Sequence, residues 1–462
     1  MIPFGWLQIF RVGLVQAALG AMVVLTTSTL NRVMVVELAL PALLPGFLVA
    51  LHYLVQVARP RMGFGSDKGG RRTPWIVGGM AVLATGGVLA SVATAWMASN
   101  RTAGMALAVF AFCLIGLGVS ASGTSLLVML AKRVPEGRRA AAATIVWMMM
   151  ILGFAVTSGL AGNMLDPYSP LRLVVVTACV CAVALVIAMV AIYKLEGSIL
   201  ARTAGPADET VQPAFRQALA QVWAEPAARQ FTIFVFFSML AYSAQDLILE
   251  PFAGTVFGFT PGASTSLSGV QHGGVLAGMI LVALAGVLGA RWSHKPVLRH
   301  VGSLRGWTVG GCIASAAALA GLSAAGFIGP GWPLKETVFA LGVANGAFSI
   351  GAISSMMRLA NHGRHAREGV RMGLWGAAQA IAFGLGGLMG TAASDMARWL
   401  IASPGVAYAS VFGLEAALFV LSAVLAWNVG KPATQMGKPA KPDLPTTKHQ
   451  NVLFSLTNGA QP

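Results

Sequence analysis

The loop from Gly63 to Arg72 reads GFGSDKGGRR and separates two long apolar runs. Its glycines allow a tight turn and a close approach of the flanking helix ends. Asp67 is its single acidic residue, and such a carboxylate can face a helix N-terminus, where the helix dipole favours negative charge. Basic residues hold a loop on the cytoplasmic side of a membrane. We therefore predict a cytoplasmic loop that latches two parts of a membrane protein, through Gly63, Asp67, Lys68, Gly70, Arg71 and Arg72.

The chain around this loop has the composition of a membrane protein. Of its 462 residues, 56% are hydrophobic and only 10% are charged, and the mean hydropathy is +0.74. Soluble domains average about 25% charged residues. Taking about 20 apolar residues per membrane span, we predict an all-α protein with twelve transmembrane helices.

The positive charge follows a topological pattern. Most of the 31 Lys and Arg residues fall in alternate loops and in the C-terminal segment, which places those loops and both termini in the cytoplasm. Membrane orientation thus accounts for the net charge of +16. We expect membrane lipid, and no nucleic acid, as a partner. The basic residues of the predicted outer loops are Arg32, Arg101, Arg172, Lys335 and Arg398.

The chain divides into two halves with a polar connection. We predict an N-terminal six-span half at residues 1–194, a cytoplasmic connector at 195–229, a C-terminal six-span half at 230–430 and a disordered cytoplasmic tail at 431–462. The connector is polar and contains proline, and the tail is rich in Pro and Lys with little periodicity.

The two halves are similar in sequence. An alignment at constant offset pairs Met129 with Met357 and Trp147 with Trp375. A parallel repeat of six-span halves is typical of the major facilitator fold. The opening loop also matches the loop motif of that superfamily, G-x-x-x-D-[RK]-x-G-R-[RK], at every specified position. We predict this fold, with two six-helix pseudo-repeats.

Sequence signatures of catalysis are missing. The chain has no P-loop, no H-E-x-x-H, no nucleophile elbow and no Cys/His cluster of zinc spacing. Membrane prenyltransferases need two Asp-rich clusters to hold a diphosphate through Mg²⁺, whereas this chain offers only Asp246 with Glu250. We therefore expect a non-enzymatic protein without catalytic residues or a metal site. Because the fourth and tenth spans carry almost no ionisable residues, we expect a lipophilic ligand.

Two histidines lie at membrane depth, His52 in LVALHYLVQ and His272 in SGVQHGGVLAG. An imidazole nitrogen with a free lone pair can coordinate the magnesium of a chlorin, and Gly273 and Gly274 would leave room for a flat ring. The alternative for each histidine is a hydrogen bond to a neighbouring helix. We take His272, Gln271 and His52 as candidate pigment-binding residues.

Two long segments are distinctive: AQDLILEPFAGTVFGFTPGASTSLSGVQHGGVLAG, and LTTSTLNRVMVVELALPALLPG followed by RPRMGFGSDKGGRRTPWIVGG. Both strongly resemble the PucC family, the bacteriochlorophyll delivery branch of the major facilitator superfamily. The resemblance implies a multi-pass protein of the bacterial inner or photosynthetic membrane. It also implies a role in light-harvesting complex assembly, by binding, channelling or delivering bacteriochlorophyll or a precursor, with no covalent cofactor. The residues that match the family's motifs are Asn31, Arg32, Glu37, Asp67, Gln245, Asp246, Glu250, Gln271 and His272.

The short loop lacks an insertion that is common in light-harvesting assembly members of the family. This short form is similar to the member encoded beside bacteriochlorophyll synthase genes. Three functions therefore stay open. The first is pigment delivery to light-harvesting or reaction-centre subunits. The second is a non-catalytic partner subunit of bacteriochlorophyll synthase, and the third is export of an amphipathic small molecule.

Polar residues close the first and seventh predicted spans. Asn31, Arg32 and Glu37 follow the first span, while Gln245, Asp246 and Glu250 end the seventh. In a two-fold fold these segments face each other on the outer side. We hypothesise that Arg32 pairs with Asp246 or Glu250 across the seam and gates a lateral opening for pigment. A structural salt bridge without a gating role is the alternative.

Overall fold

The computed structural model of the chain describes residues 4–56, 71–196, 220, 222–291, 303–361 and 368–429. These residues form helices and connecting loops, and no strand occurs among them. The N-terminal part holds α1 (Trp6–Thr27), α2 (Thr29–Arg32), the π-helical turn η1 (Val33–Glu37), α3 (Leu43–Val55), α5 (Thr73–Met97), α6 (Arg101–Arg133), α7 (Glu136–Leu165) and α8 (Pro170–Ile192). The C-terminal part holds α10 (Pro226–Phe257), α11 (Pro261–Arg291), α13 (Leu304–Ile328), α14 (Leu334–Asn361), α15 (Glu368–Leu400) and α16 (Pro404–Asn428).

Ten of the described helical stretches are long and apolar enough to cross a membrane. α3 is apolar but spans 13 residues, and α15 spans 33 residues without being one of the ten. The chain is thus a multi-pass membrane protein. α10 begins at Pro226, inside the predicted connector 195–229, because proline suits the first position of a helix. Most of that connector and the whole predicted tail 431–462 lie outside the described residues.

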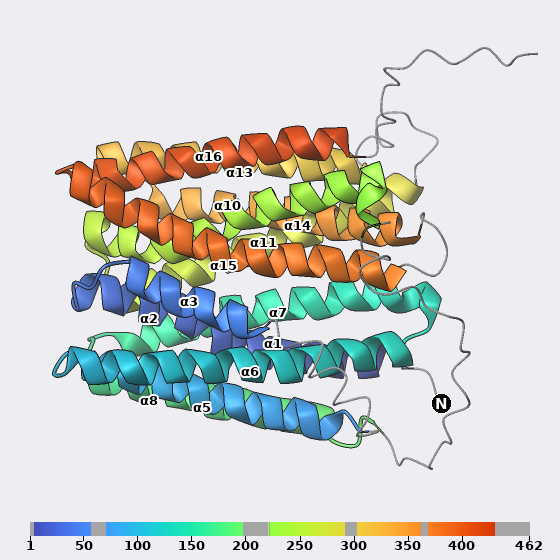
Figure 1. Cartoon of the computed structure of the whole chain (residues 1–462), viewed down its shortest axis with the longest axis horizontal. Coiled ribbons are helices and arrows are strands. Elements are labelled where there is room, and N and C mark those ends of the chain that lie inside the picture. Colours follow the sequence, from blue (N-terminus) through green and yellow to red (C-terminus); the bar gives the residue numbers. More distant parts are fainter. Residues whose placement is uncertain are drawn as a thin grey trace, which may run out of the picture. The chain divides into compact units, whose positions relative to one another are not determined.

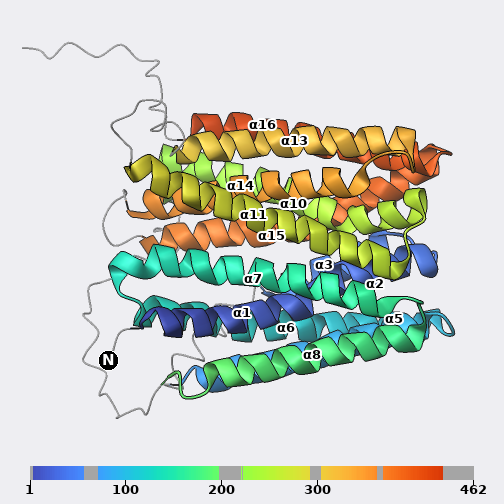
Figure 2. The ribbon, with the colours of Figure 1, turned by 180° about the vertical axis from the view of Figure 1, so that it is seen from behind.

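The helices within residues 4–429 run side by side along one direction (Figure 1). The N-terminal helices lie together, and the helices from α10 onward form a second group beside them, as the reverse view also shows (Figure 2). One hydrophobic core is built almost entirely from residues of the N-terminal part, and a second core is built from residues 222–426. A third, small cluster joins Ile151 of α7 to Val275 and Met279 of α11.

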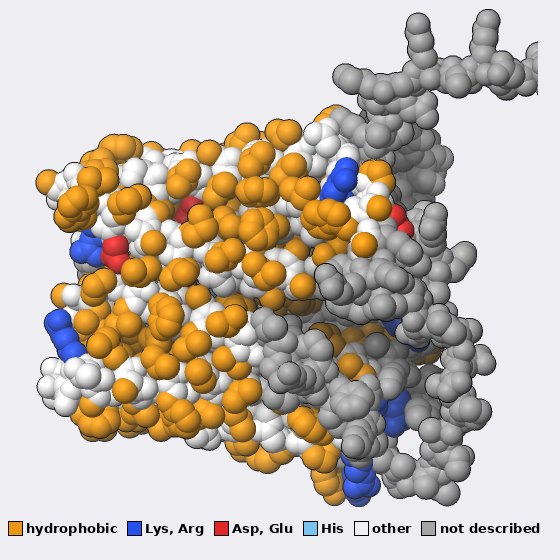
Figure 3. Space-filling model, viewed as in Figure 1, with side chains coloured by type: hydrophobic (Ala, Val, Ile, Leu, Met, Phe, Trp, Pro, Cys, Tyr) orange, Lys and Arg blue, Asp and Glu red, His pale blue; other side chains and the backbone are white. Residues whose placement is uncertain are grey.

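The outside of this body is apolar. One face is covered largely by hydrophobic side chains, with Lys and Arg near its two ends (Figure 3). Large hydrophobic side chains are also exposed on other helices, such as Val190 and Leu171 of α8. Lipid chains satisfy such a surface, whereas a soluble monomer rarely exposes contiguous apolar patches above a few hundred Å².

The two parts meet where α7 packs on α11 and where α3 packs on α15. The α7–α11 contact depends on glycine, because a Cβ atom at Gly162 would lie 2.7 Å from the carbonyl oxygen of Gly262. Further along the same two helices, a Cβ at Gly269 would lie 2.9 Å from the backbone nitrogen of Gly159. Small residues of this kind let membrane helices approach closely. The backbones of α7 and α11 are therefore in direct contact at the seam.

Candidate functional site

The seam contains an unusual backbone group on α10. Pro251 lies inside this helix and has no N–H, so the carbonyl oxygen of Leu247, four residues earlier, lacks its helical donor. The Asn31 amide fills this gap, because its Nδ2 donates to Leu247 O at 2.6 Å from the other part of the chain. Both side chains are buried. Since a buried carbonyl without a partner is costly, Asn31 completes the backbone bonding of α10.

Two further donors of the same segment reach across the seam. The Ser28 hydroxyl donates to Oε1 of Glu250. The Arg32 guanidinium donates from one terminal nitrogen to the carbonyl oxygen of Phe259 at 2.6 Å. Gly254 leaves the space for this guanidinium, because a Cβ there would lie 3.0 Å from an Arg32 nitrogen. The segment from Ser28 to Arg32 thus bonds to α10 at two points and to the residue Phe259, just after this helix, at a third.

We predicted an ion pair of Arg32 with Asp246 or Glu250, and the predicted partner of Arg32 is wrong. Arg32 forms its salt bridge with Glu37, five residues later, and Glu250 is bonded instead by Ser28. The reason is local. The π-helical turn η1 ends at Glu37, and its wider winding brings residues five apart together. Glu37 is about one-third exposed and Arg32 is buried, so the pair lies at the edge of the seam.

The remaining seam candidates lie deeper along α10. Asp246 accepts a hydrogen bond from Nε2 of Gln271, on α11, at 3.2 Å. Gln245 is fully buried, and neither its amide oxygen nor its nitrogen has a hydrogen-bond partner among the described residues. The structure therefore brings Asp246 and Gln271 together and leaves Gln245 apart from them.

His272 lies on α11 at the seam and faces α7. Its ring meets the Phe154 ring edge-on, with centroids 5.0 Å apart. Its Nδ1 lies 2.8 Å from the carbonyl oxygen of Ser268, which can only accept, so Nδ1 carries the proton. Nε2 then keeps its lone pair, and no hydrogen bond reaches it from the described residues. This is the tautomer that a metal-ligating histidine needs.

The glycines after His272 are not equivalent. A Cβ at Gly273 would meet nothing within 4 Å, so this position is open as expected. A Cβ at Gly274, in contrast, would collide with the carbonyl oxygen of Phe339 on α14. Gly274 therefore serves the α11–α14 contact, and the expectation that it leaves room for a ring is wrong.

His52 occupies a different environment on α3. Its Nδ1 lies 2.7 Å from the carbonyl oxygen of Val49 in its own helix, and the side chain is buried. Its ring begins a series of aromatic rings that crosses the seam, from Tyr53 to Phe383 of α15 and on to Tyr242 of α10. Successive centroids are 4.1, 5.5 and 5.9 Å apart. These rings pack against one another and tie α3 to α15 and α10 across the seam.

Two carboxylates that sequence reasoning missed also join the parts. Asp395, near the end of α15, accepts from the backbone N–H groups of Ala42 and Leu43 at 2.9 and 2.8 Å, at the start of α3. Asp166, just after α7, accepts from the Thr260 hydroxyl and from the Gly262 N–H at 2.6 and 3.2 Å, at the start of α11. A carboxylate stabilises a helix N-terminus through its free N–H groups. In the sequence, the feature that could have indicated each contact is a single Asp at the end of an apolar run.

The predicted cytoplasmic loop is described only at its end. Gly63, Asp67, Lys68 and Gly70 lie outside the described residues, whereas Arg71 is exposed and Arg72 precedes α5. The backbone N–H groups of Arg72 and Thr73 donate to Glu196 at 2.7 and 3.0 Å. Burial raises the pKa of Glu196, but these bonds, the Thr73 hydroxyl and the Arg72 charge outweigh it, so the pKa lies below its usual value.

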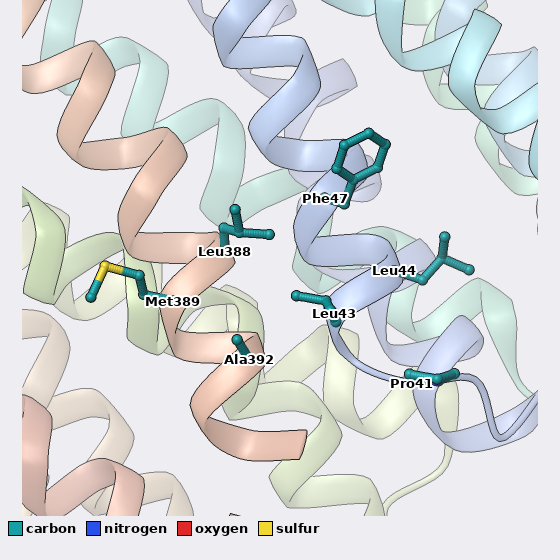
Figure 4. Close-up of a pocket in the computed structure, with 7 residues that line it drawn as sticks. All are labelled: Pro41, Leu43, Leu44, Phe47, Leu388, Met389 and Ala392. Carbon is teal, nitrogen blue, oxygen red and sulfur yellow. The ribbon is translucent and has the colours of Figure 1, made fainter. Parts of the chain in front are cut away.

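An apolar groove of about 710 Å³ follows the contact of α3 with α15. Figure 4 shows its lining residues on these two helices and, for Pro41, on the loop that precedes α3. One end of the groove lies beside the Asp395 contact, because Leu43, whose backbone N–H donates to Asp395, lines the groove together with Pro41. A second groove of about 710 Å³ lies between α11, α13 and α14, near Trp307. Neither groove is lined by His272, and no cluster of three or more potential metal ligands occurs in the described ranges.

These features belong to a recognisable family. The family model described as PUCC protein matches residues 29–433. A "Bacteriochlorophyll synthase 44.5 kDa chain" of Rhodobacter capsulatus is 53% identical over 428 residues, which is 93% of this chain and 96% of that one. The chain belongs to the PUCC family. A "Protein PucC" of Rhodobacter capsulatus is 28% identical, covering 91% of each chain.

The fold of this PUCC family member is shared with membrane transporters. A D-xylose–proton symporter superposes with a TM-score of 0.65 at 14% identity, covering 91% of this chain and 97% of that one. A peptide transporter superposes with a TM-score of 0.63 at 14% identity, covering 93% and 97%. The predicted major facilitator fold is therefore confirmed at the level of the overall helical architecture. At this identity the likeness says nothing about the ligand.

Proposed function

We propose that this PUCC family member is a pigment-handling assembly factor, which binds bacteriochlorophyll or a precursor and delivers it during light-harvesting complex formation. The observation that carries the proposal is the family itself, together with a relative at 53% identity whose name contains bacteriochlorophyll. In this proposal the protein is not itself an enzyme. It spans the bacterial inner or photosynthetic membrane twelve times, in two six-helix pseudo-repeats, with both termini in the cytoplasm.

His272 supports this proposal chemically. The Nδ1–H bond to Ser268 orients the imidazole and leaves the Nε2 lone pair available. Nε2 would hold the magnesium of a chlorin, and the absence of a side chain at Gly273 would leave room for the ring next to the imidazole. His52 and the aromatic series from Tyr53 to Tyr242 would contact the flat macrocycle, and Gln271 lies next to the ligating residue.

The closed seam supports a gating role. Three buried donors between Ser28 and Arg32 hold the two parts together. The carboxylate contacts of Asp166 and Asp395 add to this at the starts of α11 and α3. The groove between α3 and α15 lies on this same seam. Separation of α3 from α15 would therefore open a path between the membrane and the interior, through which a lipophilic pigment could enter sideways. The loop with Asp67 would hold the parts together on the cytoplasmic side.

The test is an absorption spectrum of the protein purified in mild detergent from a phototrophic host. We expect a bound bacteriochlorin or precursor that is lost in His272→Ala and only weakened in His52→Ala, because His52 would contact the ring without holding its magnesium. Pigment retained in both variants would keep the function and remove both residues as the axial ligand. A colourless wild-type protein without pigment-protein partners would contradict the proposal and favour export of an amphipathic molecule.

A second function is favoured by one observation. The relative at 53% identity carries the name of a bacteriochlorophyll synthase chain. Because the sequence of the present chain has only one carboxylate pair, Asp246 with Glu250, the proposal here is a non-catalytic partner subunit of that enzyme. Co-purification of the synthase with a colourless protein would support this second function over pigment binding.

A further inference from the structure

Three helices of the C-terminal part meet at a layer of aromatic rings. The Tyr242 ring of α10 lies 6.3 Å from the Phe348 ring of α14, centroid to centroid. The Phe348 ring lies 5.6 Å from the Phe419 ring of α16. All three side chains are buried. This ring layer fixes which faces of α10, α14 and α16 point toward one another.

A polar layer lies one helical turn from the ring layer. In α10, Asp246 lies four residues after Tyr242. In α14, Asn345 lies three residues before Phe348, and in α16, Glu415 lies four residues before Phe419. Residues three or four apart lie on one face of a helix. Because α14 and α16 run opposite to α10, all three steps lead toward the same end of the bundle. Asp246 and Glu415 are indeed close enough to interact electrostatically.

The polar layer is incompletely bonded. Glu415 is 2% exposed, and neither of its carboxyl oxygens has a hydrogen-bond donor within the described part of the chain. Asn345 is fully buried, and its Oδ1 accepts from the Ser315 hydroxyl at 2.9 Å while its Nδ2 has no acceptor there. Asp246 has one bond, from Gln271. Buried polar groups normally find partners, so these orphaned atoms point to a missing one.

No buried basic side chain in the described part of the chain balances the two carboxyl groups. Among the described residues the one buried Lys or Arg is Arg32, and it is engaged by Glu37. The titratable groups that interact electrostatically with Asp246 are Glu415, on α16, and the phenol of Tyr242, on α10 itself. Two carboxylates close together in an apolar interior cannot both remain ionised without a compensating positive charge.

We propose that Asp246 and Glu415, with Asn345, form a binding site for one small monovalent cation, either a proton or a sodium ion. The cation neutralises one of the two carboxylates. The Asn345 amide can serve either cation, because the Ser315 hydroxyl can donate to its Oδ1 or, after the amide flips, accept from its Nδ2. Asp246 retains accessible surface, whereas Glu415 is buried, so in this proposal the cation reaches the site from the side of Asp246. The proposal does not involve His272 and does not depend on pigment handling.

Two measurements on the purified, pigment-free protein test the site. The first is the infrared C=O stretching band of protonated carboxyl groups in wild type, Glu415→Gln and Asp246→Asn. The second is the midpoint of thermal unfolding in sodium chloride against choline chloride at equal ionic strength. Glu336→Gln is the matched control, because Glu336 lies exposed in the first turn of α14.

A proton in the site predicts a C=O band that disappears in Glu415→Gln, shifts in Asp246→Asn and stays in the control. A sodium ion predicts a higher unfolding midpoint in sodium chloride, lost in both site variants and kept in the control. The proposal is overturned if wild type shows neither a protonated-carboxyl band nor a sodium effect, or if both signals survive in the site variants. Should Glu415→Gln fail to fold, Asp246→Asn and the wild-type measurements still decide.

Discussion

The Asn31 amide and Pro251 form a pair whose energetic coupling can be measured. Asn31→Ala leaves the Leu247 carbonyl buried without a donor, which costs about 1–3 kcal/mol of the free energy of unfolding. Pro251→Ala restores a backbone N–H four residues beyond Leu247, so the helix can then supply the bond itself. We therefore expect Asn31→Ala to be at least about 1 kcal/mol less destabilising in the Pro251→Ala background than in wild type.

The assay is a double-mutant cycle on the free energy of unfolding in mixed micelles. The cavity left by Asn31→Ala and the intrinsic helix preference of alanine over proline each appear on both sides of the cycle, so they cancel in the coupling energy. Asn163→Ala on α7 is the control, because this asparagine is exposed and should change stability by less than about 0.5 kcal/mol. Equal effects of Asn31→Ala in both backgrounds, within about 0.5 kcal/mol, would refute the idea that Asn31 replaces the bond that proline removes.

Three further predictions concern the contacts between helix ends. The pKa of Glu196 is lowered in the folded state, so this residue contributes to stability above its ordinary pKa of 4.5, and the contribution is lost as the pH falls below that value. Glu196→Gln should therefore weaken the fall of the thermal unfolding midpoint at acid pH. An unchanged dependence of the midpoint on pH would contradict this. Gly162→Ala should lower the free energy of unfolding by about 1–3 kcal/mol through overpacking against α11. Gly159→Ala should lower it less, because a Cβ atom there would meet nothing within 4 Å. Equal losses of stability would argue against the close crossing of α7 and α11. Asp395→Ala should lower stability by about 1 kcal/mol, as loss of a helix cap does, and Asp395→Asn, which keeps one acceptor oxygen, should lose less in the same unfolding titration.

The sequence was sufficient to predict the helical membrane architecture and the meeting of the two seam segments. Apolar runs near the length of a membrane span leave little choice of structure. Asn31 and Glu250 stand out because polar residues are rare in that background, and the structure does place their segments against each other. The repeat and the exact number of spans stay predictions.

The partners within the seam were less accessible from sequence. Arg32 pairs with Glu37 because a π-helical turn places them together, and no residue pattern announces such a turn. The Pro251 signal was visible in the sequence, but the acceptor it exposes is a backbone atom of Leu247, which side-chain reasoning overlooks. Pairing by charge alone therefore chose the wrong bonds.

The polar layer shows a different limit. Glu415 and Asn345 are visible in the sequence as polar residues within apolar runs, yet nothing in the sequence places them at one level with Asp246. Their common level depends on how α10, α14 and α16 are aligned along their axes, which the packing of Tyr242 on Phe348 sets. Such alignment is a property of three-dimensional packing, and linear spacing does not contain it.

The bond from Asn31 to Leu247 also bears on how the protein is made. The chain is synthesised from its N-terminus, so α1 and α2 enter the bilayer long before α10 emerges from the ribosome. When α10 is inserted, one of its carbonyl groups has no donor within its own helix, and the hydrocarbon around it offers none. The earlier half is then already in place to receive it. The first half thus acts as an assembly template for the second, and separate expression of the second half would leave that carbonyl facing lipid.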